Sequence, residues 1–398
     1  MSFISNEENF VGNIYQRFPV NVAKGKGCSL WDTEGKEYID CMGGYGVALV
    51  GHCNDRVVNA IKKQAEHLIT CHMSLHNDTR LEFLNKLFTI VPQNLNKVFF
   101  SNSGTESVEA AIKFSRKYTK KKGIIALNGS YHGKTFGALS VTYNDKYRKS
   151  FLPLLDGVKF VSYNDLDKLV DIINNPDNNI GTIIVEPIQG ETGIIVPPNG
   201  FIKKIRTICN DHNLILIFDE IQSGLGRTGK MWAGQHWDTQ PDIMCLAKGI
   251  AGGVPMGLTL LRSEILDCIK LGEHSSTFAG NPLACAAGSA TIDSLLDDHL
   301  VENSRKVGKI FKEGLLDLKD SHKIIRDVRG FGMMLGVEMK FDIKDILFDG
   351  IKNGILILYS GRNILRLLPP LVMDDDICKK SIDLISMLIT REEKRRNV

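Results

Sequence analysis

Two short apolar runs constrain the fold of this chain most. The first, residues 214–218, is followed by Asp219 and Glu220, and the second, residues 243–246, leads into Lys248. Uninterrupted apolar runs of this length are typical of strands that are buried on both faces of a parallel sheet. Open α/β sheets bind their ligands at the carboxyl ends of such strands, so the acid and the lysine indicate a site. These residues alone also fit a structural ion pair between two buried charges.

The same pattern recurs through the middle of the chain. Seven candidate strands lie near residues 97–101, 123–127, 158–161, 182–186, 214–218, 243–246 and 257–261. Strands that alternate with helices predict an α/β domain with a mostly parallel sheet. Asn281 and Pro282 then open a long helix, because proline at the first helical position loses no hydrogen bond.

The length of 398 residues allows two compact lobes. We expect residues 1–54 to join the small lobe, residues 55–290 to form the large domain and residues 291–398 to form a C-terminal small domain. Short strands near 333–339 and 355–358 are expected in the small lobe.

Smaller elements are expected near the N-terminus. Residues 27–40 read as two short strands around a turn at Thr33-Glu34-Gly35, which predicts a β-hairpin. Asp55 is expected to cap an amphipathic helix. A second helix is predicted from an apolar stripe that consists of Leu81, Leu84, Leu87 and Val91.

Composition and charge exclude several classes of protein. The 49 basic and 46 acidic residues give a net charge of +3, so nothing requires nucleic acid or a membrane surface as a partner. No run approaches the roughly 20 apolar residues of a membrane span, and the N-terminus does not resemble a secretory signal. Nine scattered cysteines without a C-x-x-C pair indicate reduced thiols, so we expect a cytoplasmic protein. His72 and His76 lack a third ligand, and no metal site is predicted.

Two glycine-rich segments resemble nucleotide-binding motifs. The first, G-L-G-R-T-G at residues 224–229, follows the wrong strand and leads into no helical stripe, so we reject a dinucleotide fold. The second, N-G-S-Y-H-G-K-T at residues 128–135, is one residue short of a P-loop. A P-loop nucleotide hydrolase remains an alternative, and it requires nucleotide binding that Lys134→Ala abolishes.

A better phosphate site follows the first strand of the predicted sheet. That strand ends near Ser101, and Ser103-Gly104-Thr105-Glu106 is an S-x-x-E capping box that begins a helix. Free amides and the positive end of the helix dipole meet there and favour a negative charge by about 0.3–2 kcal/mol. An ordinary helix cap is the plain alternative.

The segment D-E-I-Q-S-G-L-G-R-T-G followed by A-K-G, together with the loop S-N-S-G-T-E, resembles the class III pyridoxal-phosphate-dependent aminotransferases. The resemblance covers nearly the whole chain. It implies an α/β fold of type I, with a mostly parallel seven-stranded sheet in a large domain and a smaller α/β lobe from the chain termini.

The resemblance also assigns roles to the charged residues. It implies that Lys248 binds pyridoxal phosphate covalently and moves the proton between substrate and cofactor. Only the neutral amine attacks a carbonyl, so burial must lower the pKa of Lys248. Asp219 would hold the pyridine nitrogen protonated, which makes the ring an electron sink.

Further cofactor contacts follow from the same resemblance. Gln222 matches a donor to the ring hydroxyl, and Tyr131 matches an aromatic that stacks on the ring. Thr277 matches a threonine that reaches the cofactor phosphate of the other subunit, which implies a homodimer with shared active sites. The phosphate loop consists of Ser103, Gly104 and Thr105.

Four positions bear on the substrate. Glu191 resembles the gate glutamate of ornithine and acetylornithine aminotransferases, and Arg366 resembles the arginine that binds the α-carboxylate of glutamate. We expect the two to pair when an ω-amine donor binds and to separate for glutamate. Lys134 stands where relatives usually carry arginine, and it offers a point charge without a bidentate fork. Tyr45 matches a tyrosine of ornithine aminotransferases.

The resemblance predicts an aminotransferase that uses glutamate and 2-oxoglutarate and acts on the terminal aldehyde of an N-protected semialdehyde in arginine or lysine biosynthesis. The protecting group is either acetyl, as in N-acetylglutamate semialdehyde, or a small acidic carrier protein linked to aminoadipate or glutamate semialdehyde. The motif Y-H-G-K-T favours the carrier-dependent branch. Ornithine δ-aminotransferase is the nearest alternative, 4-aminobutyrate aminotransferase comes next, and a non-catalytic binder of pyridoxal phosphate is a further one.

Overall fold

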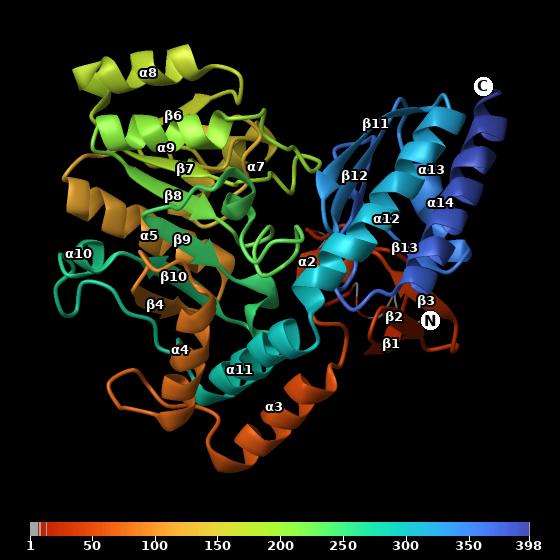
Figure 1. The fold of residues 1–398 in the computed structure, drawn as a ribbon, viewed down its shortest axis with the longest axis horizontal. Coiled ribbons are helices and arrows are strands. Elements are labelled where there is room, and N and C mark those ends of the chain that lie inside the picture. Colours follow the sequence, from red (N-terminus) through yellow and green to blue (C-terminus); the bar gives the residue numbers. More distant parts are fainter. Residues whose placement is uncertain (1–6, 8, 13, 398) are drawn as a thin grey trace.

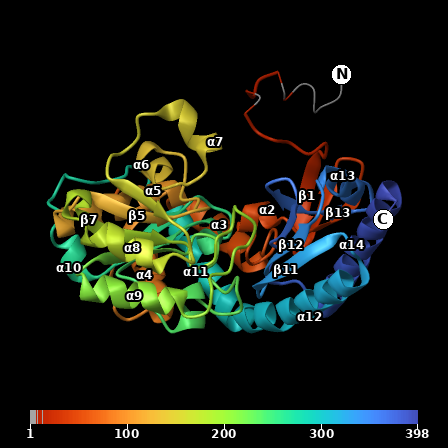
Figure 2. The same cartoon turned by 90° about the horizontal axis from the view of Figure 1, so that it is seen from above.

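The computed structural model describes residues 7, 9–12 and 14–397. The described chain forms two lobes (Figure 1). The large lobe holds a seven-stranded sheet, and the small lobe combines strands from both ends of the chain. Figure 2 shows helix α12 (Leu300–Ser321) leading away from the large lobe and running along the small one.

The large sheet contains all seven predicted strands. In sheet order they are β4, β10, β9, β8, β7, β5 and β6. Strand β10 is antiparallel to both neighbours, and the other paired strands are parallel. The expectation of a mostly parallel sheet is therefore confirmed. The bounds are β4 (Lys97–Ser101), β5 (Gly123–Leu127), β6 (Val158–Val161), β7 (Ile180–Val185), β8 (Ile215–Asp219), β9 (Ile243–Leu246) and β10 (Gly257–Leu261).

The central strands are apolar throughout because helices cover both faces of the sheet. Alternate residues of β8 show this directly. Leu216 and Phe218 belong to a cluster that includes α8 (Leu166–Asn174) and α9 (Phe201–Asp211). Ile215 and Ile217 point the other way, into a cluster that includes α5 (Gly104–Thr119). Full burial of such a side chain contributes about 1.5–3 kcal/mol, so the sheet is fixed from both sides.

Three further helices of the large lobe pack together: α3 (Asp55–His67), α4 (Asp78–Ile90) and α11 (Pro282–Asp297). The predicted opening of α11 is confirmed, with Asn281 as its N-cap and Pro282 at its first position. The expected boundary near residue 290 falls inside this helix.

Two details of the predicted helices are wrong. The cap of α3 is Asn54, whose side chain accepts from the amides of Arg56 and Val57, and Asp55 is the first helical residue. In α4, Leu81 is 57% exposed, while Phe83 and Leu87 are fully buried.

The small lobe contains an antiparallel sheet in the order β11 (Ile325–Phe331), β12 (Met334–Met339), β15 (Ile364–Leu367) and β14 (Leu358–Ser360). Its helices are α12, α13 (Lys344–Lys352) and α14 (Asp375–Arg396). A second sheet joins β1 (Val22–Lys26), β2 (Ser29–Asp32), β3 (Glu37–Asp40) and β13 (Ile355–Leu356).

Strand pairing in the second sheet connects the two ends of the chain. The predicted hairpin is confirmed as β2 and β3, and β3 also pairs in parallel with β13. The run 355–358, expected as one strand, is divided between β13 and β14, which belong to different sheets.

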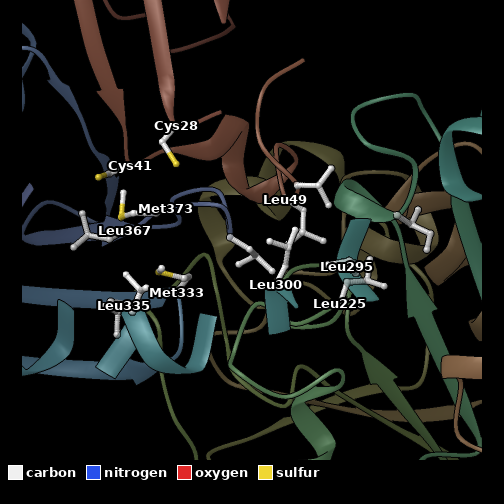
Figure 3. Close-up of a cluster of buried hydrophobic side chains, with 14 of the residues drawn as sticks. Cys28, Cys41, Leu49, Leu225, Leu295, Leu300, Met333, Leu335, Leu367 and Met373 are labelled. Atoms are coloured by element: carbon white, nitrogen blue, oxygen red, sulfur yellow. The ribbon is translucent and has the colours of Figure 1, made fainter. Parts of the chain in front are cut away.

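The two lobes share one apolar core (Figure 3). Labelled side chains from both lobes gather in this cluster, among them Cys28, Leu225, Leu295 and Met333. Arg227 is fully buried at the same junction, where its Nη1 donates to the carbonyl oxygens of Met333 and Pro369. The lobes are thus held together by both apolar and polar contacts.

The described residues contain neither a membrane-spanning helix nor a metal-binding cluster. None of the helices is long and apolar enough to cross a membrane. In the same residues, no group of three or more histidine, cysteine, aspartate or glutamate side chains has an arrangement that could hold a metal ion.

Candidate active site

Asp219 ends β8 and is 5% exposed. Its Oδ2 lies 2.7 Å from Nδ1 of His132, and its Oδ1 accepts from the amide of Ile221 at 3.1 Å. His132 is also buried, in the loop that follows β5. The contact partner of Asp219 is therefore His132, and in the described part of the chain no ion pair joins Asp219 to Lys248.

Glu186 adds a second buried acid beside this pair. Its Oε1 accepts from the amide of Tyr131 at 2.9 Å, and its Oε2 accepts from the amide of Gly190 at 3.0 Å. Burial raises the pKa of Glu186, while the nearby His132 opposes the shift. The Glu186 carboxyl group thus connects the loop that contains Tyr131 with the loop that contains Gly190.

Sequence reasoning missed both His132 and Glu186, although each had a signal. Glu186 directly follows the buried strand β7, as Asp219 ends β8. His132 stands next to Tyr131 in Y-H-G-K-T.

Lys248 follows β9 at the same edge of the sheet. Strands β8 and β9 pair in parallel with Asp219 opposite Cys245, so Lys248 lies three residues beyond the neighbour of Asp219. The backbone of Lys248 has a φ of 50°, in the left-handed region. Burial lowers the pKa of Lys248, and the charge of Asp219 opposes this. The amine is therefore shifted toward the neutral form that a nucleophile needs.

The predicted phosphate loop begins α5. Ser103 is the N-cap, and its Oγ accepts from the amide of Glu106 at 3.3 Å. The second half of the predicted capping box is wrong, because Glu106 accepts from the amide of Asn102 at 2.7 Å. The amides of Gly104 and Thr105 open the helix, where amides have no intrahelical acceptor.

Gln222 and Tyr131 are the two residues that the sequence predicts to contact the cofactor ring. The Oε1 atom of Gln222 is buried and has no hydrogen-bond partner among the described residues. It lies against Gly190, where a Cβ would collide with it. Tyr131 packs edge to face on Tyr147, with ring centroids 5.7 Å apart. Burial and nearby acids raise the pKa of Tyr131 to about 12.

Thr277 is exposed in the loop before α11. The adjacent Ser276 accepts from the side-chain amide of Asn102 at 2.9 Å, which connects this loop to the start of the phosphate loop. Phe278, the next residue, is also exposed.

The residues that the sequence predicts to bind substrate lie around Arg366. This side chain is fully buried in β15, and its Nη1 donates to Glu191 Oε2 at 2.8 Å and to the carbonyl of Gly190 at 3.1 Å. Its Nε and Nη2 atoms have no partner in the described part of the chain. The ring of Tyr45 lies 5.5 Å from the guanidinium. Lys134 is exposed, with its Nζ 5.0 Å from the ring of Tyr147.

Comparison with known proteins identifies the family. The model for the class III aminotransferases matches residues 10–389. The chain therefore belongs to this family, and it is a pyridoxal-phosphate-dependent transaminase of fold type I. This assignment replaces the P-loop hydrolase and the non-catalytic binder as interpretations.

Individual relatives carry more specific names. The chain is 44% identical over 372 residues to the acetylornithine aminotransferase of Methanopyrus kandleri, covering 93% of this chain and 94% of that protein. It is 40% identical over 385 residues to ornithine aminotransferase 1 of Staphylococcus aureus, covering 94% and 96%. A solved structure of the Toxoplasma gondii ornithine aminotransferase, with pyridoxal phosphate at its active site, has a TM-score of 0.95 and 32% identity, covering 100% of this chain and 95% of that one.

The residues present fit pyridoxal phosphate. A helix N-terminus suits its phosphate, a buried carboxylate suits its pyridinium, and the buried, unpaired amide oxygen of Gln222 belongs to a side chain that can also donate. When bound, the cofactor supplies an electron-withdrawing ring that takes up the charge formed as a proton leaves the substrate carbon.

Proposed function

We propose that the enzyme transfers an amino group between glutamate or 2-oxoglutarate and the terminal aldehyde of an N-protected semialdehyde. The observation that carries this proposal is the 2.8 Å pair between Arg366 and Glu191. A buried arginine can bind the α-carboxylate of glutamate once Glu191 moves aside. With Glu191 in place, the guanidinium stays neutralised while a substrate with a blocked α-amine presents its ω-amine.

The chain's own residues then have defined tasks. Lys248 would hold the cofactor and, in its neutral form, move the proton at the reacting carbon. Asp219 would keep the ring nitrogen protonated, and His132 would orient the Asp219 carboxylate by its 2.7 Å contact. Ser103, Gly104 and Thr105 would bind the phosphate.

The remaining cofactor residues act from the sides of the ring. Tyr131 would stack on the ring, and Gln222 would donate to its hydroxyl. We also propose a cytoplasmic homodimer in which Thr277 serves the phosphate of the partner subunit.

The identity of the blocking group rests on Lys134. Its ammonium is exposed near Tyr147, where relatives usually carry arginine, and a point charge is less suited to bidentate recognition of a carboxylate. We favour a substrate linked through its α-amine to a small acidic carrier protein, as aminoadipate or glutamate semialdehyde, over N-acetylglutamate semialdehyde, because the overall sequence pattern, including Y-H-G-K-T, resembles the carrier-dependent branch. Lysine or arginine biosynthesis is the corresponding pathway.

A second candidate function is that of an ornithine δ-aminotransferase. It is favoured by Tyr45, whose ring lies 5.5 Å from the Arg366 guanidinium and whose phenol is available to a free α-amino acid. The Staphylococcus aureus and Toxoplasma gondii relatives carry that name.

Glu191→Gln tests the proposed gate. Loss of the charge frees Arg366 for carboxylates, so kcat/KM with glutamate should hold or rise. The ω-amine half-reaction should fall about tenfold, because the Arg366 guanidinium then lacks the charge that neutralises it when no carboxylate is bound. Single-turnover rates of both half-reactions give the comparison. If Glu191→Gln changed the rates of both half-reactions by the same factor, the proposed gate would be refuted.

A further inference from the structure

Tyr147 touches the substrate side of the site without a role in the scheme above. It belongs to the short helix α7 (Asp145–Arg148), which follows α6 (Phe136–Ser140). Its hydroxyl donates to Glu191 Oε1 at 3.3 Å, and its ring packs edge to face on Tyr131. The residue therefore joins the gate glutamate to the residue proposed to stack on the cofactor.

Two cations lie close to the same ring. The Nζ atoms of Lys134 and Lys146 are each 5.0 Å from the ring centroid of Tyr147. Cations at this distance are attracted by the negative face of an aromatic ring. Together with the edge contact to Tyr131, these neighbours restrict the ring, so the hydroxyl is held at a fixed place beside Glu191.

The phenol can act only as a donor toward Glu191. Burial raises the pKa of Tyr147 above its ordinary value, and the negative charge of Glu191 raises it further. The hydroxyl therefore keeps its proton at physiological pH. The two carboxylate oxygens of Glu191 are thus held by different donors, Oε2 by Arg366 and Oε1 by Tyr147.

We propose that Tyr147 is a positioning residue that holds Glu191 against Arg366 and so sets the balance between the two half-reactions. The inference rests on the proposed function of this pair as a gate. Both contacts of Glu191 exist in the same conformation, so the phenol stabilises the closed gate. A glutamate carboxylate that takes Arg366 must displace Glu191 from both donors.

Removal of the phenol should therefore act in opposite directions on the two kinds of ligand. A ligand that needs Arg366 free gains affinity when the closed state is less populated. A ligand that needs the closed state loses affinity only as far as the closed fraction falls, so the ratio of the two affinities changes. A residue that merely supports the loop would weaken both.

Tyr147→Phe keeps the ring and its packing and deletes the hydroxyl. In the holoenzyme, glutarate, a dicarboxylate without an amine, should bind about three- to tenfold more tightly, as expected for loss of one hydrogen bond that stabilises the competing state. The KM for α-N-blocked ornithine should rise by a smaller factor, set by the fall in the closed fraction. Titration calorimetry and steady-state kinetics measure the two.

Two controls make the test specific. Tyr143→Phe is the matched control, because Tyr143 lies in the same segment and packs its ring on Phe160. It should change neither value. In the Glu191→Ala background, Tyr147→Phe should have no effect, since the phenol acts through the Glu191 side chain.

Each contrary outcome is informative. Unchanged or weaker glutarate binding by Tyr147→Phe, or an equal effect in the Glu191→Ala background, would overturn the role of Tyr147. Tighter glutarate binding in an enzyme that does not accept α-N-blocked ornithine would support the gate contact and instead reject the proposed substrate.

Discussion

At the residue scale, the candidate site contains several polar atoms that are buried without partners. Within the described residues these include Gln222 Oε1, His132 Nε2 and two nitrogen atoms of Arg366. An unpaired buried donor or acceptor costs about 1–3 kcal/mol. Proteins retain such unpaired atoms where a ligand supplies the missing partners. Here the unpaired atoms belong to residues at the cofactor and carboxylate positions that we propose.

Glu220 offers a test of how burial acts on a single carboxyl group. It accepts from the amide of Gly234 at 2.9 Å and from Ser223 Oγ at 2.6 Å, and burial raises its pKa from 4.5 to about 7. The folded state holds this proton more tightly than the unfolded chain. Its contribution to stability is therefore full below about pH 4.5 and is lost as the pH rises through about 7.

Glu220→Gln carries no ionisable group at this position. We expect its melting temperature, relative to that of the parent, to be higher near pH 8 than near pH 5. Thermal unfolding of both proteins at the two pH values measures this. A difference that is independent of pH would show that Glu220 is ionised in the folded protein throughout the range.

At the element scale, the carboxyl ends of the buried strands place the chemistry. Asp219 ends β8, Glu186 follows β7 and Lys248 follows β9, all in adjacent parallel strands. The helix α5 begins directly after β4 and contributes its N-terminus. A sheet edge of this kind brings residues together that are far apart in the sequence.

Ser103→Ala tests the contribution of the α5 N-terminus. Loss of the cap should cost about 0.5–2 kcal/mol of stability and should also weaken cofactor binding, because the first turn frays at the phosphate position. Asp374→Ala is the matched control, since Asp374 caps the distant α14 by accepting from the amide of Ile377 at 2.8 Å.

Urea unfolding and cofactor titration of both variants provide the comparison. Similar losses of stability with weaker cofactor binding in Ser103→Ala alone are expected. Equal cofactor affinity in the two variants would show that the N-terminus of α5 does not bind the cofactor phosphate.

The sequence predicted the central strands well, because burial on both faces leaves a continuous apolar run. It predicted α4 less well: Leu81 fits a helical stripe but is exposed, since the stripe that faces the core is centred on Phe83 and Leu87. The run 355–358 is divided between two sheets by strand pairings that local pattern does not encode.

The site shows the same limit. Asp219 and Lys248 were identified from their places at strand ends, and their neighbours followed from motifs. Tyr147 was missed because its contact with Glu191 joins loops 44 residues apart. Only the folded chain brings these two side chains together.

At the scale of the whole molecule, the site lies where the lobes meet. Asp219 and Lys248 come from the large sheet, while Arg366 comes from β15 of the small lobe and Tyr45 from the N-terminal segment. The shared apolar core in Figure 3 fixes this junction. Packing between the lobes therefore fixes the relative positions of the proposed substrate and cofactor residues.

A subunit-mixing experiment tests the proposed sharing of active sites. Lys248→Ala homodimers should be inactive and Thr277→Ala homodimers weak. If Thr277 serves the partner subunit, each hybrid dimer has one intact site, and random reassociation should restore about a quarter of the parent's sites. Activity equal to the mean of the two variants would show that Thr277 serves its own subunit.

The most direct test of the proposed reaction is bleaching of the yellow cofactor band by a single amino donor. Free ornithine and α-N-blocked ornithine are compared at equal concentration in separate samples. We predict fast bleaching by the blocked donor and slow bleaching by free ornithine, with carrier-linked lysine and ornithine as the next donors to compare. Preferential bleaching by free ornithine would contradict the account and make the enzyme an ornithine δ-aminotransferase.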